Sequence, residues 1–190
     1  MKTAQPLRKK KHVRKLAKCF LKKGQIRNYV LIVMSCYTAL RISDLLKLTW
    51  NDVYDFKLKR FFASISITEK KTGKSKIIAL NGKIIQALNM LALDNIQPES
   101  FIFENKRTKR AISRVQAYRI IRAAGEALRL KIRISCHSLR KSFGYRAYKS
   151  GVALAVIMTI YNHSSIAVTM RYLGITQDEI NKVYLCIEMM

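Results

Sequence analysis

The sequence is poor in acidic residues. It has 11 Asp and Glu against 37 Lys and Arg, which gives a formal net charge of +26 over 190 residues. A surplus of this size indicates a polyanionic partner, with nucleic acid as the first candidate. A ribosomal or other structural basic protein fits the composition about equally well. Because 49% of the residues are hydrophobic, a disordered basic tail is excluded, and one domain with a sizeable core is expected.

Cysteine pairs and long apolar runs are also missing. The four cysteines are widely spaced and form no C-x-x-C motif, so we expect reduced thiols and neither a disulfide framework nor a metal site (Cys19, Cys36, Cys136 and Cys186). No apolar run reaches the length of about 18 residues that a membrane helix needs. The basic N-terminus is not followed by the apolar core of a signal peptide. We therefore expect no membrane segment, no export signal and a cytoplasmic location.

The positive charge is unevenly distributed. No acidic residue precedes Asp44, and residues 106–149 contain Glu126 as their only acid. Residues 1–23 are interpreted as a basic N-terminal arm or linker, flexible over the first dozen residues and with a possible helix over 13–21. This segment is either a solvated run of charge or an arm that follows DNA phosphates. Residues 24–190 are expected to form the folded domain.

The hydrophobic pattern predicts a mainly helical α+β fold. Two apolar segments, 61–67 and 76–80, flank a Thr72-Gly73 turn and predict a small antiparallel β-hairpin. The helix expected over 111–130 has a predicted buried side that includes Val115 and Ile121. The other helices are expected over 24–38, 41–48, 82–93, 138–150, 152–161 and 178–189.

Polar residues with chemical potential cluster in the second half of the chain. Ser135 is a candidate N-cap, and His137 and Arg140 would share one face of the helix that it starts. A histidine and an arginine at the positive end of a helix form a potential anion site. His163 and Tyr172 follow, nine residues apart. Two imidazoles, an arginine and a phenol suggest phosphoryl transfer with tyrosine as the nucleophile.

These residues resemble the second half of the tyrosine recombinase (phage-integrase-type) active site. The first half of that site is an arginine in an Ala-Leu-Arg-Ile-Ser-acid-Leu segment, and residues 39–46 read Ala-Leu-Arg-Ile-Ser-Asp-Leu-Leu, with the arginine at position 41. The family also carries a lysine on a β-hairpin, which Lys71 in Lys-Lys-Thr-Gly-Lys matches. The motifs occur in the family's order, and the resemblance covers residues 24–188.

The sequence departs from the family pattern in two places. Tyr161-Asn162-His163 stands where the family prefers Leu-Gly-His, and asparagine tolerates the left-handed conformation that glycine would adopt. Tyr161 is a rival nucleophile, but it precedes His163 and lacks the family spacing. Typical members also have a DNA-clamping domain ahead of the catalytic one, for which residues 1–23 leave no room. Short relatives, such as the fimbrial-type DNA invertases, manage without it.

The resemblance implies a role for each residue. Tyr172 attacks a DNA phosphodiester, while Arg41 and Arg140 neutralise the charge that grows on the phosphorane. His163 donates a further hydrogen bond to the phosphate. His137 helps to take the tyrosine proton.

The resemblance implies that Lys71 protonates the leaving 5′ oxygen. A lysine is suited to this task when nearby arginines and desolvation lower its pKa. Lys70, Lys74 and Lys76 are its rivals. Asp44 either orients an arginine or a histidine of the site or is an ordinary helix-surface acid.

The implied function is a site-specific DNA recombinase that needs no metal or cofactor and works through a 3′-phosphotyrosine intermediate. The implied partners are double-stranded DNA and further copies of the chain, as a homotetramer on DNA and a monomer or weak oligomer without it. The implied location is the bacterial or phage-type nucleoid. Two alternatives stay open: a type IB topoisomerase-like nicking-closing enzyme and an inactive DNA-binding relative. The sequence leaves open the DNA target, the choice among integration, excision, inversion and dimer resolution, and whether the C-terminal helix docks in cis or in trans.

Overall fold

The computed structural model describes residues 4–91 and 96–187. Within this part of the chain the elements are α1 (Lys10–Lys22), α2 (Ile26–Tyr37), α3 (Ile42–Leu45), a 3₁₀ turn η1 (Trp50–Asp52), β1 (Tyr54–Asp55), β2 (Arg60–Phe61), β3 (Ser64–Thr68), β4 (Ser75–Ala79), α4 (Gly82–Asn89), α5 (Arg114–Ala127), α6 (Cys136–Lys149), α7 (Leu154–Tyr161), α8 (Ile166–Leu173) and α9 (Gln177–Cys186). The expected mainly helical α+β fold is confirmed. No helix of the described ranges is long and apolar enough to span a bilayer.

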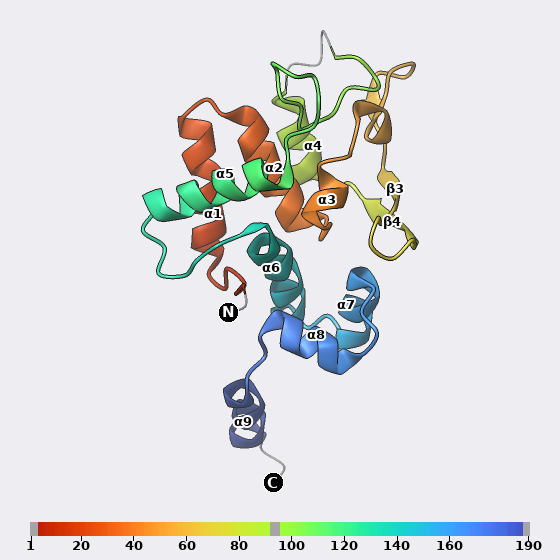
Figure 1. The fold of residues 1–190 in the computed structure, drawn as a ribbon. Coiled ribbons are helices and arrows are strands. Elements are labelled where there is room, and N and C mark those ends of the chain that lie inside the picture. Colours follow the sequence, from red (N-terminus) through yellow and green to blue (C-terminus); the bar gives the residue numbers. More distant parts are fainter. Residues whose placement is uncertain (1–3, 92–95, 188–190) are drawn as a thin grey trace.

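Helix α2 is the centre of the fold. It packs against α1, α4 and α6, and five consecutive apolar residues from Val30 to Met34 are buried on all its faces. A helix that is apolar all round belongs in the interior, which explains its position. Figure 1 shows α6 below α2 and α5, with α7 and α8 beyond α6 and the small sheets at one side. Helix α9 extends away from the other elements.

Polar caps set where the helices carrying the site residues begin. Ser135 caps α6, as predicted, by accepting a hydrogen bond from the Ser138 N–H, and Ser165 accepts one from the Val168 N–H at the start of α8. Such caps satisfy the N–H groups that the first turn leaves unpaired. Helix α7 ends at Asn162 in the left-handed conformation, at φ 53° and ψ 43°, so the predicted turn before His163 is confirmed.

The predicted hairpin is present. Strands β3 and β4 pair antiparallel with Ile65 opposite Ile78, and residues 69–74 form the connection. Gly73 has φ of 64°, a conformation that glycine adopts without strain. The connection is closed by hydrogen bonds from the Glu69 N–H to the Lys74 carbonyl and from the Gly73 N–H to the Glu69 carbonyl.

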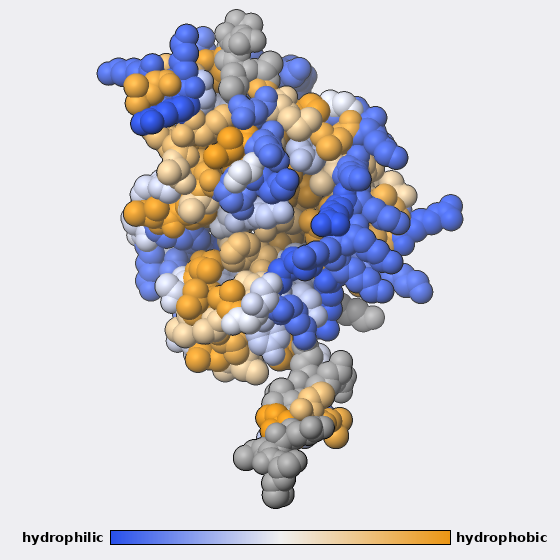
Figure 2. All heavy atoms as spheres, turned by 180° about the vertical axis from the view of Figure 1, so that it is seen from behind, coloured by the Kyte–Doolittle hydropathy of each residue, from blue (hydrophilic) through white to orange (hydrophobic). Residues whose placement is uncertain are grey.

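The N-terminal segment differs from the flexible arm expected for the first dozen residues. Leu7 is fully buried, and its N–H donates to the Ser142 hydroxyl on α6. Leu16 and Phe20 of α1 are buried in the same cluster as Ile32. Three apolar side chains spaced through a basic segment are enough to fix it on the domain. The described lysines and arginines of this segment are exposed. Figure 2 shows hydrophilic side chains gathered on the side of the molecule that carries α1 and the end of α5.

Two further expectations change. Helix α4 ends at Asn89, earlier than expected, and residues 92 and 93 of its predicted range lie outside the described residues, as do 188 and 189 of the last helix. Val115 is 57% exposed, so its predicted burial is wrong. Helix α5 buries Ala117, Ile121 and Ala124, which recur at spacings of four and three residues. Val115 falls off that stripe.

Candidate active site

Arg41 stands immediately before α3 and is the N-cap residue of that helix. Its Nη1 lies 2.6 Å from Oε2 of Glu69, and its side chain is 17% exposed. The other N–H groups of this guanidinium make no hydrogen bond to the described residues. Arg41 is therefore held on one side and open on the other, which leaves part of its planar fork for an anion from solvent.

Arg140 lies one turn into α6 and is only 3% exposed. Its Nη1 donates to the Ala39 carbonyl, and its Nη2 lies 3.4 Å from the Tyr161 carbonyl. Ala39, with φ of 54°, is two residues before Arg41. Arg140 thus joins the segment that carries Arg41 to the end of α7. No acid of the described residues pairs with this buried guanidinium, which favours an anionic ligand.

His137 lies in the first turn of α6, three residues before Arg140. Partial burial lowers the pKa of its imidazole, and the positive charges of Arg140, Lys141, Arg41 and Lys71 lower it further. The ring is therefore neutral at physiological pH and able to accept a proton. Its centre lies 6.0 Å from the centre of the Tyr172 ring.

His163 follows the left-handed Asn162 and contacts α8. Its Nδ1 lies 3.1 Å from the hydroxyl of Thr169, whose oxygen is also 3.2 Å from the Ser165 carbonyl. Burial lowers the pKa of His163 to about 4, with Arg140 and Arg41 adding to the effect and Glu69 opposing it. The imidazole is thus neutral at pH 7. A neutral imidazole carries one N–H. His163 can therefore donate from Nε2 only when its Nδ1 is the acceptor of a hydrogen bond from the Thr169 hydroxyl.

Tyr172 on α8 faces the two histidines. Its ring centre lies 4.9 Å from that of His163 and 4.7 Å from the ammonium of Lys141 on α6. Its hydroxyl is buried and makes no well-formed hydrogen bond within the described residues, although the Arg140 guanidinium lies close enough to act on it. Burial raises the pKa of this phenol, and the charge of Arg140, a hydrogen-bonding contact with the Arg140 guanidinium and the charge of Arg41 oppose this. A buried phenolic hydroxyl without a partner is unusual and points to a functional role.

Tyr161, the rival nucleophile, has a structural role instead. It is fully buried; its hydroxyl donates to the Arg140 carbonyl at 2.7 Å and accepts from the Gly144 N–H at 2.7 Å. Burial raises the pKa of this phenol strongly. With its hydroxyl bonded to two backbone groups and buried, Tyr161 is not placed to attack a substrate.

Lys71 lies at the exposed tip of the hairpin. It lines a hollow of about 640 Å³ together with Arg41 and His137. The residues on either side of it are tethered: the Lys70 N–H donates to Asp44 at 3.2 Å, and the Thr72 hydroxyl donates to Glu69 at 3.0 Å. The hairpin tip is therefore fixed at the site while the Lys71 side chain stays exposed.

Asp44 and Lys76 differ from what the sequence suggested. Asp44 is buried, so it is no surface acid, and it accepts from the hairpin backbone rather than from an arginine or a histidine of the site. Lys76, a rival of Lys71, is half-buried; its Nζ lies 3.1 Å from Glu69 and 3.4 Å from the Ile160 carbonyl. Lys76 thus joins β4 to α7, and its ammonium is already bonded to Glu69 and to the Ile160 carbonyl.

Sequence reasoning missed Glu69. It is 0% exposed and lies between Arg41 and Lys76, and Asn162 Nδ2 also donates to it at 2.9 Å. Burial disfavours its charge, but hydrogen bonds from Asn162, Arg41 and Lys76 outweigh this and hold its pKa at about 2. The only signal in the sequence was an acid at the end of a predicted strand in a very basic chain.

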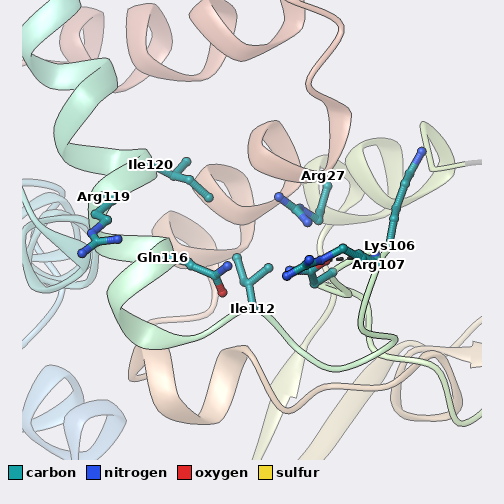
Figure 3. Close-up of a pocket in the computed structure, with 8 residues that line it drawn as sticks. Arg27, Lys106, Arg107, Ile112, Gln116, Arg119 and Ile120 are labelled. Carbon is teal, nitrogen blue, oxygen red and sulfur yellow. Dashed lines mark hydrogen bonds between the residues drawn. The ribbon is translucent and has the colours of Figure 1, made fainter.

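A second hollow of about 550 Å³ adjoins the first, since Ile112 lines both. Figure 3 shows the side chains around it, which come from α2, the loop before α5 and α5 itself: Arg27, Lys106, Arg107, Gln116 and Arg119. The two hollows together form a concave basic surface that leads away from the site residues. Among the described residues no group of three or more His, Cys, Asp or Glu could hold a metal ion.

Comparison with known proteins decides the family. The family model described as the phage integrase family matches residues 7–179. The chain belongs to this family. It is 35% identical over 184 residues to the probable integrase/recombinase YoeC of Bacillus subtilis, covering 97% of each chain. It is 28% identical over 154 residues to a tyrosine recombinase of Pseudothermotoga lettingae, covering 80% of this chain and 51% of that one.

Solved structures agree on the fold of this phage integrase family member. The crystal structure of XerH site-specific recombinase bound to a palindromic difH substrate superposes with a TM-score of 0.75 at 18% identity, covering 98% of this chain and 54% of that one. The chain thus spans about half the length of that recombinase and of the Pseudothermotoga protein, but nearly all of YoeC. It is a tyrosine-type recombinase, a DNA strand transferase that cleaves and rejoins DNA.

Proposed function

We propose that Tyr172 is the nucleophile of this recombinase and that five further side chains surround the scissile phosphate: Arg41, Lys71, His137, Arg140 and His163. The observation that supports this most is the buried Tyr172 hydroxyl, which makes no well-formed hydrogen bond in the described chain and lies beside the two histidines and within reach of the charge of two arginines. A phosphate that enters beside this hydroxyl supplies the partner that it lacks.

The proposed cleavage step balances without a metal or a nucleotide. The Tyr172 oxygen bonds to phosphorus, and its proton passes to the neutral imidazole of His137. The bond from phosphorus to the 5′ oxygen breaks, and that oxygen takes a proton from Lys71. The product is a 3′-phosphotyrosine and a 5′ hydroxyl. Because the phosphodiester is replaced by another ester, a 5′ hydroxyl from a second strand can reverse the step.

Electrostatic stabilisation comes from the two arginines. Arg41 presents the open side of its guanidinium, and Arg140 supplies a charge that no acid of the described chain pairs. His163 adds a hydrogen bond from Nε2 when its Nδ1 accepts a hydrogen bond from the Thr169 hydroxyl. Removing one such donor costs on the order of a hundredfold or more in rate.

DNA binding fits the basic surface. The duplex would run from the hollow at Arg41 and Lys71 into the adjoining hollow at Arg27, Arg107 and Arg119. These groups recognise phosphates and carry no sequence information by themselves. The proposal includes action at paired sites as a homotetramer, a monomer or weak oligomer without DNA, and a nucleoid location. A topoisomerase-like activity is the second candidate, because the same groups would serve a monomer.

The test selects the target sequence and traps the covalent adduct in one experiment. A supercoiled plasmid library with randomised inserts is incubated with the protein and quenched with SDS, and the protein-linked DNA is retained on glass fibre, digested with protease and sequenced. We expect an enriched target sequence with wild type and none with Tyr172→Phe, which should still shift the same DNA in a native gel. Adducts formed by Tyr172→Phe would show that the nucleophile is misassigned.

The selected sequence separates the two candidate activities. A plasmid with two copies should yield recombined products, and the complex on a two-site DNA should have the mass of four protomers. Relaxation of a plasmid without any copy would favour the topoisomerase reading.

A further inference from the structure

We infer that Glu69 is a positioning residue of the recombinase, whose carboxylate holds Arg41 and the turn before His163 in the arrangement that receives the scissile phosphate. This inference rests on the proposed function. It concerns a residue that touches no substrate and that acts through its neighbours.

The contacts of Glu69 come from separate segments of the chain. Oε2 accepts from Arg41 at 2.6 Å, from Asn162 at 2.9 Å and from Thr72 at 3.0 Å, and Oε1 lies 3.1 Å from the Lys76 ammonium. One carboxylate therefore joins the segment before α3, the end of α7, the hairpin tip and β4. These are the segments that carry or flank Arg41, His163 and Lys71.

Burial indicates that Glu69 stays in place when phosphate binds. Its side chain is 0% exposed, whereas that of Arg41 is 17% exposed. An incoming phosphate therefore meets Arg41 before it can reach Glu69. The carboxylate is ionised at every physiological pH, so it accepts from its cationic and amide donors at once.

The ion pair between Arg41 Nη1 and Glu69 fixes the orientation of the rest of the Arg41 guanidinium. An arginine in solution samples many rotamers, and a guanidinium tied at Nη1 presents its remaining N–H groups in one orientation. Pre-organised charge costs no reorganisation when the transition state forms, which is the advantage that Glu69 supplies. The Asn162 contact acts likewise on the left-handed residue that directly precedes His163.

The main variant is Glu69→Gln, which keeps the volume and removes the charge. We expect cleavage of pre-bound target DNA to slow at least tenfold while the dissociation constant changes less than threefold. The matched control is Glu126→Gln, since Glu126 pairs with Arg122 on the surface of α5 and its loss changes net charge equally. Glu126→Gln should cleave at the wild-type rate.

A substrate change separates positioning from general structural damage. A methylphosphonate at the scissile position lacks the charged non-bridging oxygen that Arg41 neutralises, so a misplaced Arg41 matters less on it. The rate ratio of wild type to Glu69→Gln should therefore shrink severalfold on the methylphosphonate. Loss of fold would lower both rates equally, so an unchanged ratio would overturn the inference.

Two further variants cover the remaining cases. If Glu69→Gln leaves Lys76 unpaired and unstable, combining it with Lys76→Met removes both charges and the same ratio is measured. Asn162→Gly keeps the left-handed turn but removes the amide contact, and at least a threefold slower cleavage is expected. Wild-type rates in Asn162→Gly would overturn the His163 half of the inference.

Faster cleavage by Glu69→Gln would also overturn the inference, because it would show a carboxylate that blocks the phosphate. Failure of wild type and Glu126→Gln to form any adduct would instead refute the proposed function, so the two failures are distinguishable.

Discussion

The guanidinium of Arg140 lies over the ring of Tyr161, 4.8 Å from its centre, and the Tyr161 hydroxyl donates to the Arg140 backbone carbonyl. The arginine in turn points Nη2 at the Tyr161 carbonyl. Each residue thus holds the other at both its backbone and its side chain. The pair fixes a buried positive charge next to Tyr172 without the help of an acid.

The two arginines should therefore respond differently to replacement by lysine. Arg41→Lys should lose cleavage on the order of a hundredfold with a smaller change in thermal stability, because a lysine keeps the positive charge beside the buried Glu69 carboxylate. Arg140→Lys should lose cleavage and also lower the melting temperature by several degrees, since two buried carbonyls lose a donor. Adduct formation and thermal melting measured on both variants check this. Equal melting temperatures for the two would contradict the structural role of Arg140.

The pH dependence of cleavage should report His137. In the proposed mechanism its neutral form accepts the Tyr172 proton, and burial together with the charge of Arg140 lowers its pKa from the ordinary 6.5. The rate at limiting DNA should therefore fall as the imidazole becomes protonated, with the midpoint of the fall below pH 6.5.

In His137→Gln the rate should be lower at every pH and the acid limb should disappear. A limb that persists unchanged in this variant would assign the proton acceptor to another group.

Thr169 should govern which nitrogen of His163 donates. Its single hydroxyl proton can go to His163 Nδ1 or to the Ser165 carbonyl, 3.1 Å and 3.2 Å away. Thr169→Val removes the proton, and cleavage at saturating DNA should slow on the order of tenfold, less than the loss of a donor itself. Thr169→Ser keeps the hydroxyl and should restore most of the rate. A serine variant as slow as the valine variant would show that packing, not the proton, matters.

Gly144 should tolerate no side chain. A Cβ there would overlap the Tyr161 hydroxyl and lie 2.7 Å from Leu173, in the contact between α6 and α8. Gly144→Ala should therefore reduce the free energy of unfolding by about 1–3 kcal/mol. Gly82→Ala is the matched control, because nothing lies within 4 Å of a Cβ at the start of α4. Chemical denaturation of both variants is the measurement, and equal stabilities would refute the packing argument.

Local chemistry made much of this protein predictable from its sequence. Ser135 as the cap of α6, the left-handed Asn162 and the hairpin around Gly73 follow from what each residue does to its own backbone. The order of motifs from Arg41 to Tyr172 predicted the family, which the family model over residues 7–179 confirms.

The tertiary structure decided which polar groups meet. Lys71 and Lys76 look alike in a basic hairpin, but only the fold shows that Lys76 is engaged by a buried acid and the Ile160 carbonyl, while Lys71 lines the open hollow. For the same reason the acid that contacts Arg41 is Glu69, which the sequence did not single out, while Asp44 accepts from the hairpin backbone. Contacts between residues 28 or 93 positions apart, as from Glu69 to Arg41 and to Asn162, leave no periodic trace in a sequence.

The sequence by itself determined the helices, the hairpin, the charge and the family. Short-range backbone preferences and hydrophobic spacing act over a few residues and are written in the order of the chain. How distant segments pack decided that Leu7 and Glu69 are buried. It also decided that the hydroxyl bonded to the backbone of α6 is that of Tyr161. Desolvation and pairing of a polar group are set by neighbours in space, and those neighbours exist only once the chain has folded.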